Sequence, residues 1–155
     1  MCDILLAGAT GYIGSAVAMA LVEKGYKVLC PVRQIPKAPL TGVIYEICDC
    51  TDTVAIKQLA QRFSGIEAII SCIASRTGGR QDAWLVDYRA NMTLLETAQE
   101  LAIERFILLS AICVQKPRLE FQHAKRAFEQ KLQASGLNYS IVRPTAFFKS
   151  LAGQG

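Results

Sequence analysis

Three side chains in the second half of the sequence have types and positions that could do proton chemistry. Ser110 ends an apolar run, Lys125 lies on the predicted helix that follows, and Phe121 stands four residues before the lysine. A serine, a tyrosine and a lysine at such places pass a proton during hydride transfer, because the lysine holds the nicotinamide ribose and lowers the tyrosine pKa. Phe121 occupies the place of the tyrosine, and a phenyl ring cannot pass a proton. The sequence therefore predicts that Ser110 and Lys125 are catalytic and that the usual proton donor is missing.

Two other interpretations bear on this helix. Lys125 lies among further basic residues, so an ordinary surface lysine is the alternative for it. The single histidine, His123, is expected to point elsewhere on the helix and to be solvated rather than catalytic.

A glycine motif near the N-terminus indicates where a dinucleotide would bind. Residues 8–14 read Gly-Ala-Thr-Gly-Tyr-Ile-Gly, between an apolar run and a helical pattern. The first glycine allows a tight turn, the second lets the backbone approach a pyrophosphate, and the third lets the helix pack closely on the strand. Free N–H groups at the helix start would face the anion. The residues predicted to contact the cofactor here are Gly8, Thr10, Gly11, Tyr12, Ile13 and Gly14, with purely structural turn glycines as the alternative.

The end of the second apolar run bears on which dinucleotide would bind. A carboxylate there would accept from the ribose 2′-hydroxyl of NAD, whereas an arginine can pair with the 2′-phosphate of NADP. The sequence has Arg33 at this place and no carboxylate nearby, so NADPH is favoured over NADH. A solvated loop charge is the alternative for Arg33.

Further cofactor contacts are predicted where the later apolar runs end. Asp49 could accept from the adenine amino group or cap its own loop, and residues 72–74 should pass close to the cofactor ribose. The loop at 75–80 carries two glycines and two arginines, and could close over substrate or be mobile. The remaining predicted cofactor contacts are Asp49, Cys50, Cys72, Ile73, Ala74, Lys125 and Pro144.

Apolar runs that alternate with helical stripes must position these residues. The predicted strands are 4–7, 28–32, 43–47, 68–73, 106–109 and 139–142. Pro31 should mark the end of the second strand, because proline cannot donate to a sheet ladder. Unbroken Ile, Leu and Val runs flanked by helices indicate a parallel sheet covered on both faces. We therefore predict a doubly wound α/β fold of six strands, the NAD(P)-binding Rossmann type.

The composition is that of one folded domain. The 155 residues are 52% hydrophobic and 19% charged, which is typical of a globular protein with a real core. No run reaches the roughly 18 apolar residues of a membrane span. The N-terminus shows no secretory signal or transit peptide. We expect one domain over residues 1–155, located in the cytoplasm.

Charge and cysteine content limit the partners. A net charge of +4 is compatible with an anionic cofactor or an acidic membrane surface, and equally with an ordinary basic surface. Nucleic-acid binding is disfavoured, because the basic residues lack interleaved aromatics and a recognition motif. The six cysteines show no paired zinc-ribbon spacing, and the chain has one histidine, so a metal at 48–50 is disfavoured. We predict reduced thiols and no metal site.

Several segments together resemble one enzyme family. They are LLSAICVQKP at 108–117, FxxxK at 121–125 and YSIVRPTAFFKSL at 139–151, supported by GATGYIG at 8–14, SCIASRTGG at 71–79 and acidic and aromatic residues at 82–88. These segments are similar to the NADPH-dependent divinyl chlorophyllide a 8-vinyl reductases, which are atypical short-chain dehydrogenases/reductases related to the NmrA-like proteins. Members of that family also carry phenylalanine in place of the tyrosine.

The resemblance implies NADPH-dependent reduction of the 8-vinyl group of a chlorophyllide to ethyl. A vinyl group conjugated to the macrocycle can take hydride at its terminal carbon while the ring delocalises the charge, so no tyrosine is needed. The proton could come from Lys125, Ser110, Tyr88 or water. The alternatives are a non-catalytic NADP sensor or pigment–protein assembly factor of the NmrA-like kind, and a reductase of another conjugated alkene.

The resemblance also bears on extent and partners. Family members continue for roughly another domain, which should supply much of the pigment pocket. We therefore expect this chain to be truncated at its C-terminal end and to correspond to the N-terminal half of the family. The expected partner is a chlorophyllide pigment, with peripheral contact to the photosynthetic membrane. Self-association is expected through an uncovered sixth strand with Phe147 and Phe148 exposed beside it.

Overall fold

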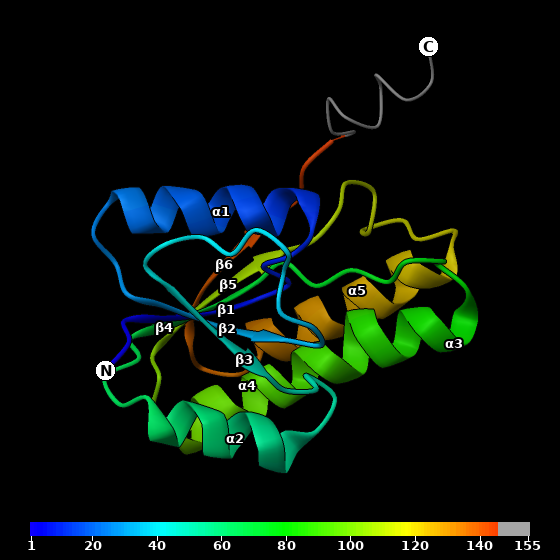
Figure 1. Cartoon of the computed structure of the whole chain (residues 1–155). Coiled ribbons are helices and arrows are strands. Elements are labelled where there is room, and N and C mark those ends of the chain that lie inside the picture. The colour runs from blue at the N-terminus through cyan, green and yellow to red at the C-terminus, as the bar shows by residue number, and fades with distance from the viewer. Residues whose placement is uncertain (146–155) are drawn as a thin grey trace.

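The structure is a computed structural model that describes residues 1–145, and it is built on a parallel sheet (Figure 1). The strands are β1 (Ile4–Ala7), β2 (Val28–Val32), β3 (Val43–Ile47), β4 (Ala68–Ser71), β5 (Arg105–Leu109) and β6 (Asn138–Val142). Their order is β3-β2-β1-β4-β5-β6, and every neighbouring pair is parallel. This is the strand order of a Rossmann-like fold, so the predicted fold class is confirmed.

Burial follows the position of each strand in the sheet. Every residue of β1, β2 and β4 is buried, as expected for central parallel strands with apolar side chains on both faces. The edge strand β6 is exposed along most of its length; Tyr139 and Val142 are 40% and 49% exposed. The sixth strand is thus exposed as predicted, and the self-association expected through it stays a prediction. Phe147 and Phe148 lie outside the described residues.

Two strand ends differ from prediction. β4 stops at Ser71 rather than at residue 73, so Cys72 and Ile73 belong to the loop that follows it. β2 continues one residue past Pro31. Proline is tolerated there because the register of β2 with β1 ends at Leu29, and the missing N–H interrupts no ladder between these two strands.

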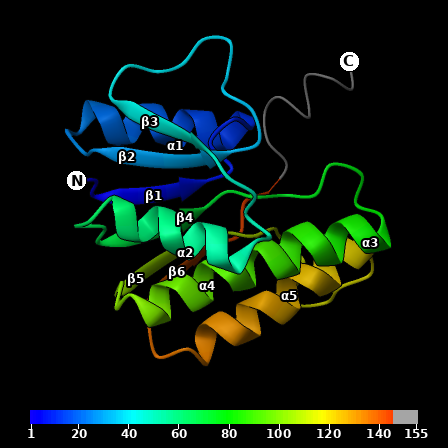
Figure 2. The ribbon, with the colours of Figure 1, turned by 60° about the horizontal axis from the view of Figure 1, so that its bottom comes forward.

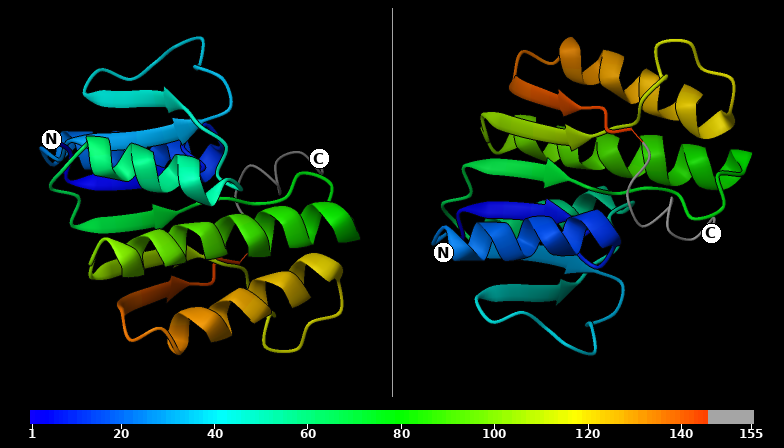
Figure 3. Two further views of the ribbon diagram at one scale, coloured as in Figure 1. Left: turned by 90° about the horizontal axis from the view of Figure 1, so that it is seen from below. Right: turned by 90° about the horizontal axis from the view of Figure 1, so that it is seen from above.

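Helices cover the two faces of the sheet unequally. They are α1 (Tyr12–Glu23), α2 (Thr53–Arg62), α3 (Arg80–Asp82), η1 (Ala83–Ala90), α4 (Asn91–Glu100) and α5 (Glu120–Gln133). α1 lies on one face against β1 and β2, whereas α2, α4 and α5 lie on the other (Figure 3). Helices therefore lie on both faces of the sheet, as the doubly wound prediction requires. No helix in this part of the chain is long and apolar enough to cross a membrane.

The segments α3, η1 and α4 form one continuous helical rod (Figure 2). Its middle part, η1, is π-helical, a rare conformation that often marks functional sites. η1 packs against α5 and places the buried Asp87 between the two helices.

The apolar core is divided by the sheet. On the α2–α4–α5 side, Phe106 of β5 packs against Phe128 of α5, with ring centroids 5.7 Å apart. On the α1 side, Ala18 packs against residues of β1 and β2 such as Leu6. Burial of each large side chain contributes roughly 1.5–3 kcal/mol. This packing fixes the carboxyl ends of the strands, where the loops of the site begin.

Candidate functional site: a pocket at the carboxyl edge of the sheet

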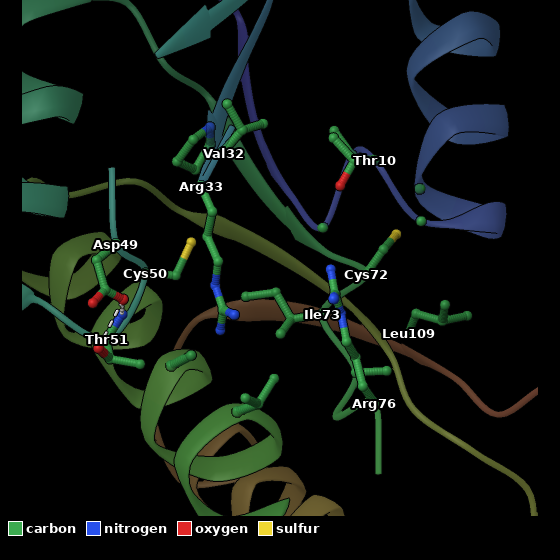
Figure 4. A pocket seen from close by; sticks show the side chains of 18 of the residues that line it. Thr10, Val32, Arg33, Asp49, Cys50, Thr51, Cys72, Ile73, Arg76 and Leu109 are labelled. Atoms are coloured by element: carbon green, nitrogen blue, oxygen red, sulfur yellow. Dashed lines mark hydrogen bonds between the residues drawn. The ribbon is translucent and has the colours of Figure 1, made fainter. Parts of the chain in front are cut away.

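A pocket of about 430 Å³ lies where the carboxyl ends of β1 to β4 meet (Figure 4). Parallel α/β sheets bind ligands at this edge, beside the reversal of strand order. The predicted cofactor residues that line it are Gly8, Thr10, Gly11, Tyr12, Ile13, Gly14, Arg33, Asp49, Cys50, Cys72, Ile73 and Ala74. Lys125 and Pro144 are the two predicted cofactor residues that do not line it. Most of the residues predicted to contact the cofactor therefore line one pocket. Their contacts with a cofactor stay predictions.

Two glycines hold the first turn of the pocket in close contact with its neighbours. Gly8 has φ +82°, and a Cβ there would lie 2.5 Å from the carbonyl carbon of Cys72. A Cβ on Gly14 would lie 1.8 Å from the Gly8 oxygen. Both positions therefore exclude side chains for reasons of folding. Gly11 differs, because a Cβ there would be 3.6 Å from the Gly8 oxygen, an ordinary contact distance.

Gly11 also begins α1 as its N-cap, and it has no side chain to occupy the helix N-terminus. An uncapped helix start presents backbone N–H groups and the positive end of the helix dipole. This end of α1 opens on the pocket, since residues 10–14 line it. The arrangement suits a phosphate group.

Two arginines reach into the same space from different elements (Figure 4). Arg33 follows β2, and Arg76 lies in the loop after β4. No acidic group among residues 1–145 lies within salt-bridge distance of either guanidinium. The pocket wall thus holds two arginines that could bind an anionic ligand, together with the carboxylates of Asp49 and Asp82. Arg33 was predicted, whereas Arg76 was mentioned only as part of a loop.

Asp49 behaves as a loop cap. Its Oδ1 accepts from the Thr51 backbone N–H at 2.9 Å and from the Thr51 hydroxyl at 2.8 Å. These bonds stabilise the ionised form and hold the pKa of Asp49 below its ordinary value. The capping interpretation is thus realised, and the contact with adenine stays a prediction.

The thiols in the pocket wall are protonated at neutral pH. Burial raises the pKa of Cys50 to about 12 and that of Cys72 to about 11. A protonated thiol is neither a good nucleophile nor a metal ligand, so both act as apolar wall. Among residues 1–145, no group of three or more His, Cys, Asp or Glu side chains could hold a metal.

Lys125 is buried and paired, so the surface-lysine interpretation is wrong. Its Nζ lies 3.0 Å from Oδ1 of Asp87, which is fully buried. Asp87 also accepts from the backbone N–H of Ser75 at 3.3 Å and from its hydroxyl at 2.6 Å. Asp87 therefore joins α5 to the loop after β4. His123 is exposed, as predicted.

Ser110 is engaged by a second buried carboxylate. Its hydroxyl donates to Oε2 of Glu129 at 2.9 Å, and Arg143 Nε donates to Oε1 of the same carboxylate at 2.9 Å. This ion pair raises the pKa of Arg143. Pro144 follows, and its carbonyl accepts from the N–H of Ile112 at 3.1 Å. Ser110 and Pro144 thus join β5, α5 and the end of β6 beside the pocket rather than in its wall.

The sequence missed Asp87 and Glu129 as organising residues. One signal was available for Glu129, because it stands four residues after Lys125 and so on the same face of α5. Phe121 stands four residues before the lysine, and its ring lies 3.7 Å from where a Cβ on Gly78 would be. Phe121 therefore lies under the loop that carries Arg76.

Comparison with known proteins agrees with this geometry. A family model described as NAD(P)H-binding matches residues 8–154. The chain is 44% identical, over 97% of its length, to the chloroplastic divinyl chlorophyllide a 8-vinyl-reductase of Zea mays, and it covers 42% of that protein. It is 31% identical, over 98% of its length, to photosystem II assembly factor Ycf39 of Cyanophora paradoxa, covering 48% of it. The chain thus spans less than half the length of these curated relatives.

Solved structures share the fold. L-threonine dehydrogenase from Clostridium difficile superposes with a TM-score of 0.82 at 22% identity, over 92% of this chain and 53% of that one. WbmH of Bordetella bronchiseptica, in complex with NAD+, gives a TM-score of 0.78 at 20% identity, over 92% of this chain and 56% of that one. At such identities the likeness establishes the Rossmann-like architecture alone.

Proposed function

Because this chain belongs to the NAD(P)H-binding family, we propose that it binds NADPH and serves the reduction of the 8-vinyl group of divinyl chlorophyllide a to ethyl. The observation that carries the proposal is the 44% identity with a vinyl reductase along nearly the whole chain. The choice of NADPH over NADH is supported by Arg33 at the end of β2, where it lines the pocket. When bound, the cofactor would supply the hydride.

The residues of the chain supply binding and orientation in this proposal. The N-terminus of α1 and the glycine turn hold the diphosphate, and Arg33 holds the 2′-phosphate. Phe121 offers no proton, which suits a conjugated substrate that can delocalise the charge left by hydride addition. Ser110 donates to Glu129 and Lys125 pairs with Asp87, so in this proposal both are positioning residues, and Tyr88 or water would supply the proton. Their catalytic role in the stricter sense stays a prediction.

Two measurements test the proposal. The first titrates NADPH and NADH into the purified chain and follows the nicotinamide fluorescence; Arg33→Gln should weaken NADPH binding about tenfold and leave NADH binding unchanged. The second incubates the chain with NADPH and divinyl chlorophyllide a and separates the pigments by chromatography. Monovinyl product supports the reductase. Failure of the chain to bind either nucleotide would refute the proposal.

A second candidate is a non-catalytic NADPH-binding factor in the assembly of pigment–protein complexes. The similarity to Ycf39 along nearly the whole chain favours it, as does the engagement of both Ser110 and Lys125 by buried carboxylates. Tight NADPH binding with no monovinyl product would support this candidate over the reductase.

A further inference from the structure

The loop after β4 carries one arginine, Arg76, that lines the pocket, and the backbone on both sides of it is held by hydrogen bonds. Arg76 lines the pocket, and Figure 4 shows its side chain passing Ile73 toward the side where Thr10 lies. The residue is exposed, and no carboxylate in residues 1–145 forms a salt bridge with it. A guanidinium left available inside a pocket can bind a planar or tetrahedral anion through two parallel N–H bonds.

Both neighbours of Arg76 are anchored by carboxylates. On one side, Ser75 donates its N–H and its hydroxyl to the buried Asp87. On the other side, Thr77 donates its N–H at 3.0 Å and its hydroxyl at 3.1 Å to Oδ2 of Asp82. The N–H of Thr77 is the main reason that the pKa of Asp82 lies below its ordinary value. The backbone that carries Arg76 is therefore held before any ligand arrives, which lowers the entropy lost on binding.

The position of the loop selects the anion. β4 pairs with β1 up to the contact of Ser71 with Ala7, so the loop after β4 directly adjoins the glycine turn after β1. The close approach of Gly8 to the Cys72 backbone shows the same adjacency. Arg33 approaches from β2, on the opposite side of β1 in the strand order. Arg76 is thus the arginine beside the glycine turn, where a dinucleotide places its diphosphate.

We propose that Arg76 binds the diphosphate of the dinucleotide from the side facing the glycine turn, while Arg33 reads the 2′-phosphate. This inference rests on the proposed cofactor binding and assigns a separate residue to it. Because the diphosphate is common to NADPH and NADH, Arg76 should contribute to the binding of both. It should contribute nothing to the preference between them.

The test compares dissociation constants of NADPH and NADH for the wild-type chain and for Arg76→Gln. We expect both constants to rise by the same factor, roughly tenfold for the loss of one charge-assisted contact. Arg80→Gln is the matched control: it removes the same charge at the start of α3, directly after the loop, and Arg80 does not line the pocket. Arg76→Lys should recover part of the affinity, since a point charge replaces the fork.

Adenosine 2′-monophosphate, which lacks the diphosphate, sharpens the assignment. Its affinity should be unchanged in Arg76→Gln and weakened in Arg33→Gln. A loss confined to NADPH in Arg76→Gln would overturn the proposal in favour of the 2′-phosphate. Unchanged affinity of Arg76→Gln for both dinucleotides would also overturn it, and Arg76 would then contact the substrate or solvent. If the wild-type chain bound neither dinucleotide, the proposed function itself would fail, which is a distinguishable result.

Discussion

Asp87→Asn should strongly destabilise the protein, because it leaves the ammonium of Lys125 buried without a counter-charge. Asp87 is fully buried and Lys125 is 8% exposed. At their separation of 3.0 Å, an effective dielectric of about 20 gives an attraction of roughly 5 kcal/mol before desolvation is subtracted. Removing one partner of a buried pair costs about 3–5 kcal/mol. Asparagine keeps an oxygen for Ser75, so we expect the lower end, about 3 kcal/mol.

The assay is urea unfolding of the wild type, Asp87→Asn, Lys125→Met and the double variant. Replacing both members of a buried pair by neutral groups of similar size is often close to neutral. The double variant should therefore be more stable than Asp87→Asn, with a coupling free energy above about 1.5 kcal/mol. Asp82→Asn makes the same chemical change at a partly exposed carboxylate of the adjoining helix turn and should have a much smaller effect.

The outcome that would refute this reasoning is a coupling free energy below about 0.5 kcal/mol, since that is the range of independent sites. If Asp87→Asn does not fold at all, the double variant still decides. Recovery of folding by Lys125→Met identifies the unpaired ammonium as the cause, and continued failure assigns the loss to the Ser75 contacts instead.

Three further predictions concern the glycine turn, the carboxylate of Asp82 and the cysteines. Gly14→Ala should unfold or severely destabilise the chain, because its Cβ would lie 1.8 Å from the Gly8 oxygen. Gly11→Ala should change the free energy of unfolding by no more than about 1 kcal/mol and should weaken NADPH binding. Thermal melts measure the first effect, and NADPH titrations measure the second. The pKa of Asp82 is lower in the folded than in the unfolded chain, so its ionised carboxyl stabilises the fold above about pH 4. This contribution disappears as the pH falls through the folded pKa. Urea midpoints measured from pH 5 to 3 should therefore fall less in Asp82→Asn than in the wild type. Among the cysteines of residues 1–145, the exposed Cys113 should react first with a thiol reagent at pH 8, well before Cys50, because the raised pKa of Cys50 keeps that thiol protonated. Peptide mapping of the modified chain gives the order.

The sheet and the glycine turn could be predicted from sequence because their determinants are local. The central strands β1, β2 and β4 are short, mainly apolar runs, and the turn after β1 requires glycine at positions where a Cβ would collide with backbone. These two facts place the pocket at the carboxyl edge. Arg33 follows directly, since its place is fixed by the end of β2.

The polar centre of the site could not be predicted in the same way. Asp87 and Glu129 lie in helical segments with mixed composition, where a carboxylate ordinarily faces water. Their burial depends on the packing of η1 and of β6 against α5, which brings together residues that are distant in sequence. The π-helical turn at η1 is likewise set by packing, because no residue pattern distinguishes it from an α-helix.

The two buried carboxylates change which charges a ligand meets in the pocket. In a site with a catalytic tyrosine, the lysine must remain available to lower the phenol pKa and to hold ribose. Here Phe121 removes the first task, and Asp87 neutralises Lys125 while it anchors the loop after β4. The cationic side chains that line the cavity are then Arg33 and Arg76, beside the carboxylates of Asp49 and Asp82. Cofactor affinity should therefore depend on the arginines directly and on Lys125 only through the loop that Asp87 holds.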